Sequence, residues 1–201
     1  SGKLIYSTHK KELPNYGVFD ELRYFNSKSS KKNYFNYKNK KIDFLICEDM
    51  WSEKYLMDRT YEKLDLIIII NASPYEIGKF DIRKKLASKR AKYCSANLIY
   101  LNLVGSQDDL IFDGGSFVMN NLGKIIMQSS FFKECEEIID LDKKIEERKI
   151  KKINKYEHIY KALMEGLRNY IIKNNFKSVT LGLSGGIDSA LTLAILADTL
   201  D

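Results

Sequence analysis

The feature that most constrains the fold is an almost unbroken run of leucine and isoleucine at residues 64–70, Leu-Asp-Leu-Ile-Ile-Ile-Ile. Isoleucine is β-branched, and a run without regular polar alternation is typical of a strand covered on both faces. Two-sided cover is the arrangement found in parallel sheets with helices packed on them. The sequence therefore predicts a mixed α/β protein in which residues 64–70 form an inner strand.

A helix is predicted over residues 79–93, where apolar side chains recur at helical spacing. Ile82, Leu86 and Ala87 are expected to face the protein, with the lysines of this segment in solvent. Shorter patterns predict the remaining elements of the first two thirds of the chain. They are strands at 3–8, 42–46 and 98–104, a possible helix at 55–63, and a hairpin that joins 113–119 to 124–128 through Asn120-Asn-Leu-Gly123.

One cysteine stands where the predicted strand 42–46 ends. Cys47 follows Ile46 directly and is followed by two carboxylates, Glu48 and Asp49. The edge of a parallel sheet where strands end is where α/β proteins place their chemistry. A thiol at that edge is a candidate nucleophile, provided that a base and an oxyanion stabiliser are nearby. The alternative interpretation is that Cys47 is a small apolar core residue.

Composition excludes several classes of protein. The 201 residues carry 33 basic and 27 acidic side chains, a net charge of +6, and the lysine-rich runs 28–41 and 143–155 are interpreted as solvated rather than as nucleic-acid sites. Three cysteines stand far apart, in no metal or disulfide pattern, which favours a reducing compartment. No apolar run approaches the ~20 residues that cross a bilayer. We therefore expect a cytoplasmic, soluble protein with no membrane and no nucleic-acid partner.

The character of the chain changes after residue 140, where charged residues become frequent. Residues 156–174 carry a helical stripe of apolar side chains, and a strand is predicted at 178–183 with a helix from Ala190 onward. We expect a first domain over 1–140, a linker over 141–156 and the start of a second domain over 157–201.

The string Ser184-Gly-Gly-Ile-Asp-Ser189 lies between that strand and that helix. Glycines let backbone N–H groups converge, and a helix N-terminus adds positive potential, so the segment is suited to bind phosphate. It lacks the Gly-Lys-Ser/Thr of a Walker loop and resembles the pyrophosphate loop of ATP pyrophosphatases. That resemblance implies that Asp188 contacts a Mg²⁺ ion held by the phosphates. The alternative is an ordinary glycine-rich turn before a helix.

Five strings, taken in order, resemble glutamine-dependent NAD⁺ synthetase, a family that fuses a nitrilase-like glutaminase to an ATP pyrophosphatase domain. The strings are Leu-Pro-Asn-Tyr-Gly-Val-Phe-Asp-Glu (13–21), Ile-Cys-Glu-Asp-Met-Trp (46–51), Asn-Ala-Ser-Pro-Tyr (71–75), Gln-Asp-Asp-Leu-Ile-Phe-Asp-Gly (107–114) and Leu-Gly-Leu-Ser-Gly-Gly-Ile-Asp-Ser-Ala (181–190). The resemblance implies the C-terminal part of a nitrilase-like α-β-β-α sandwich over 1–140. An adenine-nucleotide α-hydrolase-like parallel-sheet domain would then begin at 157.

The resemblance also implies roles for individual residues. Cys47 would attack the side-chain amide of glutamine, and Lys10 would stabilise the oxyanion, with its neighbour Lys11 as the rival for that role. Tyr16, Glu48 and Ser73 would line the glutamine site, and Lys79 would meet the carboxylate of the substrate. The implied ATP site consists of Ser184, Gly185, Gly186, Asp188 and Ser189, with Asp188 as the metal ligand.

The implied activity is NAD⁺ synthesis, in which ATP activates the carboxylate of nicotinate adenine dinucleotide and ammonia from glutamine displaces AMP. ATP and Mg²⁺ are the implied cofactors, and homo-oligomers are expected. The family's general-base glutamate falls upstream of residue 1, so the 201 residues alone are expected not to hydrolyse glutamine. Two other hypotheses stay open: a nitrilase-type amidase joined to a different ATP pyrophosphatase ligase, and a non-catalytic scaffold.

Overall fold

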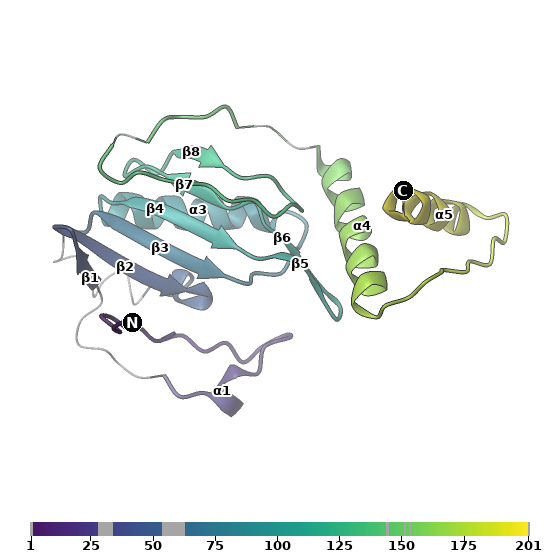
Figure 1. The fold of residues 1–201 in the computed structure, drawn as a ribbon, viewed down its shortest axis with the longest axis horizontal. Helices are drawn as coiled ribbons and strands as arrows, with labels where there is room; N and C mark the ends of the chain where they lie inside the picture. Colours follow the sequence, from purple (N-terminus) through teal and green to yellow (C-terminus); the bar gives the residue numbers. More distant parts are fainter. Residues whose placement is uncertain are drawn as a thin grey trace.

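A computed structural model of the chain describes residues 2–27, 34–53, 63–143, 145–150, 152 and 154–200. Its centre is a six-stranded mixed sheet in the order β1-β2-β3-β4-β7-β8 (Figure 1). The strands β2, β3 and β4 run parallel, and the outer neighbours β1, β7 and β8 pair antiparallel. The bounds are β1 Tyr34–Tyr37, β2 Lys40–Ile46, β3 Leu66–Asn71, β4 Asn97–Asn102, β7 Phe117–Met119 and β8 Ile125–Gln128.

The predicted inner strand is β3, between the parallel strands β2 and β4. One face of the sheet packs on helix α3 (Lys79–Tyr93), where Ile67 and Ile69 meet Ala87 and Ala91 in the main core. The opposite face is covered less completely by the described residues. Tyr6 lies against Phe44 there, while Ile70 and Leu101 are half-exposed. The prediction of two-sided cover is therefore correct for the α3 face and only partly met on the other.

A second, two-stranded sheet forms from β5 (Val104–Gln107) and β6 (Leu110–Asp113) and projects toward helix α4 (Lys155–Lys173). Helix α5 (Ile187–Leu200) packs against α4 on the side away from the large sheet (Figure 1). Two short helical turns complete the described elements: α1 at Glu21–Tyr24 and the 3₁₀ turn η1 at Cys47–Met50.

Most predicted elements are confirmed within one to three residues, and the mixed α/β class is confirmed. Predicted strand 98–104 divides at Leu103 into β4 and β5. Residues 3–8 and 178–183 are not strands, because no described strand pairs with either segment and a strand needs a hydrogen-bonded neighbour. The possible helix at 55–63 falls almost wholly on residues 54–62, outside the described residues; Lys63, which is described, is not helical.

The predicted orientation of α3 was wrong in one respect. Ile82 is 49% exposed, whereas Arg83 and Arg90 are only 0% and 3% exposed. Both guanidinium groups are surrounded by acceptors that hydrogen-bond them, which removes the cost of burying their charge. Apolar periodicity therefore placed the helix correctly but could not identify two buried arginines.

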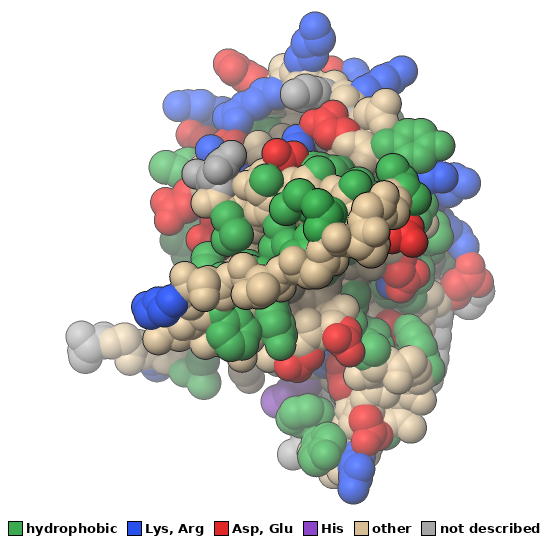
Figure 2. Space-filling model, turned by 90° about the vertical axis from the view of Figure 1, so that its right-hand side faces the viewer, with side chains coloured by type: hydrophobic (Ala, Val, Ile, Leu, Met, Phe, Trp, Pro, Cys, Tyr) green, Lys and Arg blue, Asp and Glu red, His purple; other side chains and the backbone are tan. Residues whose placement is uncertain are grey.

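Helix α5 and the segment before it present apolar side chains on the face seen in Figure 2. Leu183, Ile187, Leu191 and Leu200 are among the exposed large hydrophobic residues of this part of the chain. Among the described helices, none has the length and apolar composition required to cross a bilayer.

Candidate functional site

The carboxyl ends of β2, β3 and β4 meet at one edge of the large sheet. Ile46 pairs with Ile70, and Asn71 pairs with Asn102, so the residues that follow each strand become neighbours. The Ser73 amide donates a hydrogen bond to Asn102 Oδ1 at 2.9 Å, which joins the ends of β3 and β4. This edge places Cys47 beside the turn that begins at Asn71, as the parallel arrangement predicts.

Cys47 begins the 3₁₀ turn η1 with a backbone φ of 47°. Residues other than glycine seldom adopt this left-handed conformation, and such strain is concentrated at functional sites. The turn breaks the direction of β2 immediately at the cysteine. A hydrogen bond from the Ala72 backbone reaches the Cys47 side chain, so the end of β3 supports the thiol.

The N-terminal segment is attached to this turn by Asp49. The buried Asp49 carboxylate accepts hydrogen bonds from the Lys11 amide at 2.9 Å, the Glu12 amide at 2.8 Å and the Ile46 amide at 3.1 Å. These bonds hold the segment before Pro14 against the nucleophile turn. Lys10 is consequently close enough to influence the Cys47 thiol, and its Nζ lies 2.5 Å from Glu21 Oε1.

The charge environment of Cys47 is mixed. Burial raises the pKa of the Cys47 thiol above its usual value, and the carboxylates of Glu48 and Glu21 add to that rise. The Lys10 ammonium and the Ala72 hydrogen bond act against this rise and lower the pKa of Cys47. A thiol in this balance is largely protonated at neutral pH. Nucleophilic attack therefore requires a separate base, because the Lys10 ammonium cannot accept the proton.

Tyr16 and Glu48 lie together at the same site. The Tyr16 hydroxyl donates to the Glu48 carboxylate, 2.9 Å from Oε1 and 3.0 Å from Oε2. Burial and this hydrogen bond raise the pKa of Tyr16 to about 12, with the Cys47 and Glu21 charges contributing. The structure therefore brings Cys47, Lys10, Tyr16 and Glu48 into one cluster.

Ser73 and Lys79 have other partners. The buried Ser73 hydroxyl accepts from Arg83 Nε at 3.2 Å and is turned toward the interior. Lys79 opens helix α3, and its Nζ lies 2.5 Å from Glu76 Oε1. No hydrogen bond or ion pair among the described residues joins Lys79 to the Cys47 cluster.

The glycine-rich loop lies at the other end of the described chain, directly before α5. Gly185 has a φ of 85°, Ser184 Oγ lies 3.0 Å from Ser189 Oγ, and the Gly186 amide donates to Ser184 Oγ at 3.4 Å. Asp188 is in the first turn of α5 and is exposed. The described residues contain no group of three or more His, Cys, Asp or Glu side chains that could hold a metal.

Comparison with solved structures covers both parts of the chain. Residues of this chain superimpose on a carbon–nitrogen hydrolase from Helicobacter pylori with a TM-score of 0.55 over 62% of the chain at 20% identity, a likeness of fold. A glutamine-dependent NAD⁺ synthetase from Acinetobacter baumannii, solved with adenosine diphosphate, matches 98% of this chain and 38% of its own at 43% identity, with a TM-score of 0.91.

Comparison with curated proteins gives the same result. The glutamine-dependent NAD(+) synthetase of Acinetobacter baylyi is 43% identical over 98% of this chain, and that of Synechocystis is 42% identical over 96%. A family model described as NAD synthase matches residues 159–201. This chain is a homologue of glutamine-dependent NAD(+) synthetase. It spans 36% and 37% of the length of those two curated relatives, just over a third.

The strings shared with NAD(+) synthetase did not identify three residues that shape the site: Glu21, Arg83 and Arg90. Glu21 was inside a matching string, but only the contact with Lys10 makes it notable. Arg83 and Arg90 lie on the face of α3 that the apolar pattern assigned to hydrophobic residues. Arg90 donates to the carbonyls of Asp49, Met50 and Ser52, each at 2.7 Å, and so holds the turn that follows the cysteine.

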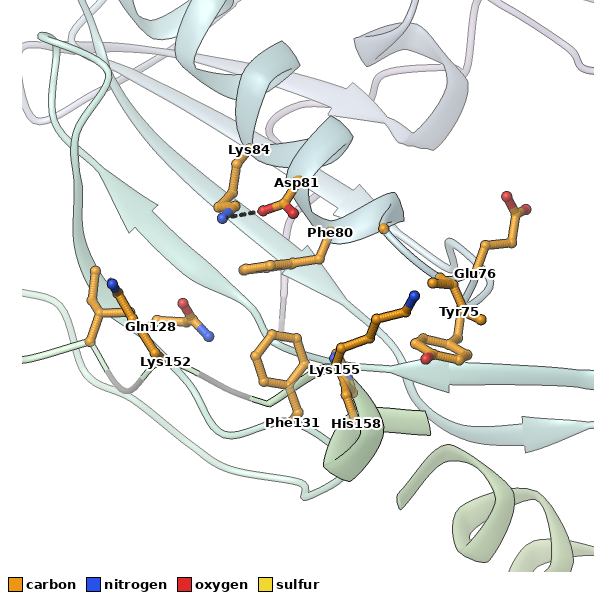
Figure 3. A pocket seen from close by; sticks show the side chains of 13 residues that line it. Tyr75, Glu76, Phe80, Asp81, Lys84, Gln128, Phe131, Lys152, Lys155 and His158 are labelled. Carbon is orange, nitrogen blue, oxygen red and sulfur yellow. Dashed lines mark ion pairs between the residues drawn. The ribbon is translucent and has the colours of Figure 1, made fainter. Parts of the chain in front are cut away.

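A separate pocket of about 550 Å³ opens beside the large sheet, between the start of α3 and the start of α4. Figure 3 shows it between the first turn of α3, Gln128 of β8 and the first turn of α4. Tyr75, Phe131 and His158 form one wall, and Lys84 on another wall pairs with Asp81 at 2.5 Å. The pocket contains neither Cys47 nor the glycine-rich loop, so it is distinct from both predicted sites.

Proposed function

We propose that the full-length protein is a glutamine-dependent NAD⁺ synthetase in which the Cys47 cluster releases ammonia from glutamine and the Ser184–Ser189 loop binds ATP. The main support is the position of Cys47 on a left-handed turn at the sheet edge, with Lys10 acting on its thiol, in a chain that is 43% identical to such enzymes over 98% of its length.

In the proposed glutaminase step, a base removes the Cys47 proton and the sulfur attacks the side-chain amide carbon of glutamine. Negative charge then develops on the carbonyl oxygen, where the Lys10 ammonium stabilises it. The C–N bond breaks, the nitrogen leaves as ammonia after taking up a proton, and a thioester to Cys47 remains. Water hydrolyses the thioester to glutamate and restores the thiol.

The remaining substrate contacts are assigned by the same pattern. Tyr16 and Glu48, which share a hydrogen bond beside Cys47, are proposed to hold the glutamine amide. Ser73 would line the site by holding the turn after β3, because its hydroxyl, amide and carbonyl are all hydrogen-bonded within the protein. Lys79 is proposed to meet the substrate carboxylate after releasing Glu76.

In the proposed ligation step, the phosphates of ATP bind at Ser184, Gly185, Gly186 and Ser189, where backbone amides and the α5 N-terminus favour negative charge. The Acinetobacter baumannii homologue was solved in complex with adenosine diphosphate, which supports the use of an adenine nucleotide. Mg²⁺ bound to Asp188 and the phosphates would neutralise charge during transfer. The nicotinate adenine dinucleotide carboxylate attacks the α-phosphorus of ATP, pyrophosphate leaves, and ammonia then displaces AMP.

We also propose that residues 1–140 form part of the glutaminase domain, 141–156 the linker, and 157–201 the start of the synthetase domain. The beginning of α4 at Lys155 supports the last boundary. A cytoplasmic enzyme is proposed because its cysteines, all of which the structure describes, are not paired in disulfides. A homo-oligomer is proposed because ammonia must reach its acceptor through the protein before water protonates it to ammonium.

The proposal is tested by assaying the full-length protein for NAD⁺ formation from nicotinate adenine dinucleotide, ATP, Mg²⁺ and glutamine. Cys47→Ala is expected to abolish both glutamate release and glutamine-dependent NAD⁺ formation, while Cys135→Ala, at an exposed cysteine, leaves both unchanged. Glutamate release by Cys47→Ala at the wild-type rate would disprove the nucleophile. If exchange of pyrophosphate into ATP required a carboxylate other than nicotinate adenine dinucleotide, that carboxylate would replace the dinucleotide as the proposed acceptor.

A further inference from the structure

A buried arginine fixes the turn that supports the Cys47 thiol. Arg83 is fully buried, and its Nη2 donates to the Ser73 and Pro74 carbonyls at 2.8 Å each, while Nε donates to Ser73 Oγ at 3.2 Å. These bonds hold the backbone directly after Ala72, whose own hydrogen bond reaches Cys47. A displacement of Arg83 would therefore move a group that stabilises the thiolate.

Asp113, at the end of β6, balances the charge of Arg83. Its Oδ1 accepts from Arg83 Nη1 at 2.7 Å and from Asn102 Nδ2 at 3.2 Å, and the residue is almost completely buried. A buried guanidinium with no carboxylate partner is strongly unfavourable, so Arg83 depends on Asp113 for its position. Through Asn102, the same carboxylate also touches the end of β4.

His158 on helix α4 lies next to Asp113. Its Nε2 lies 3.9 Å from Asp113 Oδ2 and has no hydrogen-bond partner among the described residues. Three aromatic rings surround the imidazole, with centroid distances of 5.2 Å to Tyr75, 4.6 Å to Phe131 and 5.0 Å to Phe132. Figure 3 shows His158 beside Phe131 and Tyr75 in the wall of the pocket.

The charged groups facing His158 come from three elements, β6, α3 and α4. Asp113 and Arg83 face it from the sheet side, and Glu157 and Lys161 belong to its own helix. Burial lowers the pKa of His158, so the imidazole is mainly neutral at pH 7 and approaches Asp113 as a dipole rather than as a second cation. At 3.9 Å the two groups form no hydrogen bond, so the ring acts on Asp113 only through this charge–dipole attraction.

We propose that His158, Asp113 and Arg83 act as a positioning series through which helix α4 holds the Ala72–Pro74 backbone against Cys47. The helix continues into residues 159–201, which match the NAD synthase family, so the series joins that part of the chain to the cysteine site. The catalytic significance of this inference rests on the proposed function, whereas its effect on the reactivity of Cys47 does not.

The test is the rate at which iodoacetamide alkylates Cys47 in the full-length protein, measured by mass spectrometry from pH 6 to pH 10. His158→Phe keeps a ring among Tyr75, Phe131 and Phe132 but removes the nitrogen that faces Asp113. We expect roughly threefold to tenfold slower alkylation at pH 8 and a shift of the pH midpoint upward, since a displaced Ala72 stabilises the thiolate less. His158→Gln, which can place an amide nitrogen near Asp113, is expected to restore most of the rate.

Tyr160→Phe is the matched control on the same helix. It removes the 2.6 Å hydrogen bond from Tyr160 to Asp198 of α5, which lies on the side of α4 away from the large sheet, so it should alkylate like the wild type. If His158→Phe lowers stability, the alkylation rates of His158→Gln and His158→Met are compared instead. These two side chains have similar lengths, but only glutamine carries a polar nitrogen. Faster alkylation of the Gln variant supports the series.

Equal rates and equal pH midpoints for wild type, His158→Phe and His158→Met would overturn the inference. The outcome is separable from that of the proposed function. If wild-type Cys47 reacts with iodoacetamide but the protein releases no ammonia from glutamine, the proposed function fails while the comparison of alkylation rates still decides the role of His158.

Discussion

At the scale of single residues, the reactivity of Cys47 depends on backbone conformation as much as on neighbouring charge. Its φ of 47° costs on the order of 1 kcal/mol for a residue with a Cβ, and the surrounding contacts must maintain it. Asp49 supplies part of that support through the Ile46 amide. The sequence predicted a thiol at the end of a strand, but the left-handed turn follows from tertiary contacts that no local pattern contains.

Lys10 and Lys11 are adjacent in the sequence but differ in what they do at the site. Because the Lys10 ammonium lowers the pKa of Cys47 against the effect of burial, Lys10→Met should raise that pKa further. We expect alkylation of Cys47 at pH 8 to slow by roughly tenfold, the effect of one pKa unit on the thiolate fraction. The rate of iodoacetamide labelling of the full-length protein, followed against pH, measures the change.

Lys11→Met is the matched control for that experiment. The Lys11 contact with Asp49 is made by the backbone amide, which the substitution leaves in place. The labelling profile of this variant should therefore superimpose on that of the wild type. Slower labelling in Lys11→Met than in Lys10→Met would show that the register of the two lysines had been assigned wrongly.

At the scale of elements, helix α3 shows what the sequence predicted and what it could not. Its predicted bounds, residues 79–93, coincide with the observed Lys79–Tyr93, since apolar spacing and the absence of Pro and Gly define a helix locally. The burial of Arg83 and Arg90 was not predicted, because it depends on acceptors from the 71–74 and 49–52 turns, which are distant in sequence. Likewise, residues 178–183 have strand-like composition, but pairing partners decide whether a strand forms.

Arg90 is expected to be the side chain of α3 that most stabilises the nucleophile turn. Arg90→Met keeps the aliphatic part but leaves the carbonyls of Asp49, Met50 and Ser52 without their donors. We expect the free energy of unfolding to fall by on the order of 3 kcal/mol. Urea unfolding of the full-length protein, followed by circular dichroism, measures this loss.

Lys89, the neighbour of Arg90 in the sequence, provides the control for this stability measurement. Lys89→Met removes an ion pair with Glu53 at the surface, where solvent screens the charges, so the unfolding midpoint should remain at the wild-type value. If both variants shift the midpoint equally, the loss would reflect a change on the surface of α3 and not the turn that Arg90 holds.

At the scale of the whole molecule, helix α4 is the element that joins the NAD synthase-like part to the rest. It contacts the β5–β6 hairpin along its length, through His158 near Asp113, Gly166 against Ile111, and Lys173 Nζ donating to the Ser106 carbonyl. The sequence predicted this helix from its apolar stripe and assigned it to the start of a second domain, an assignment that stays a prediction. The docking could not be predicted, because Gly166 carries no side chain to suggest a contact.

Gly166 permits the close approach of α4 to the hairpin. A Cβ at this position would lie 3.0 Å from Ile111 Cδ1 and 3.3 Å from Cγ1, so a larger side chain must separate the two elements. Gly166→Leu is expected to cost about 1–3 kcal/mol by overpacking. Hydrogen exchange measured by mass spectrometry should accelerate in residues 104–113 and 155–173.

Lys161→Leu, which adds the same side chain at an exposed position of α4, should leave exchange in the hairpin unchanged. Unaltered exchange in Gly166→Leu would mean that α4 is not docked on the hairpin in solution, and the link from His158 to Cys47 would then lose its structural basis.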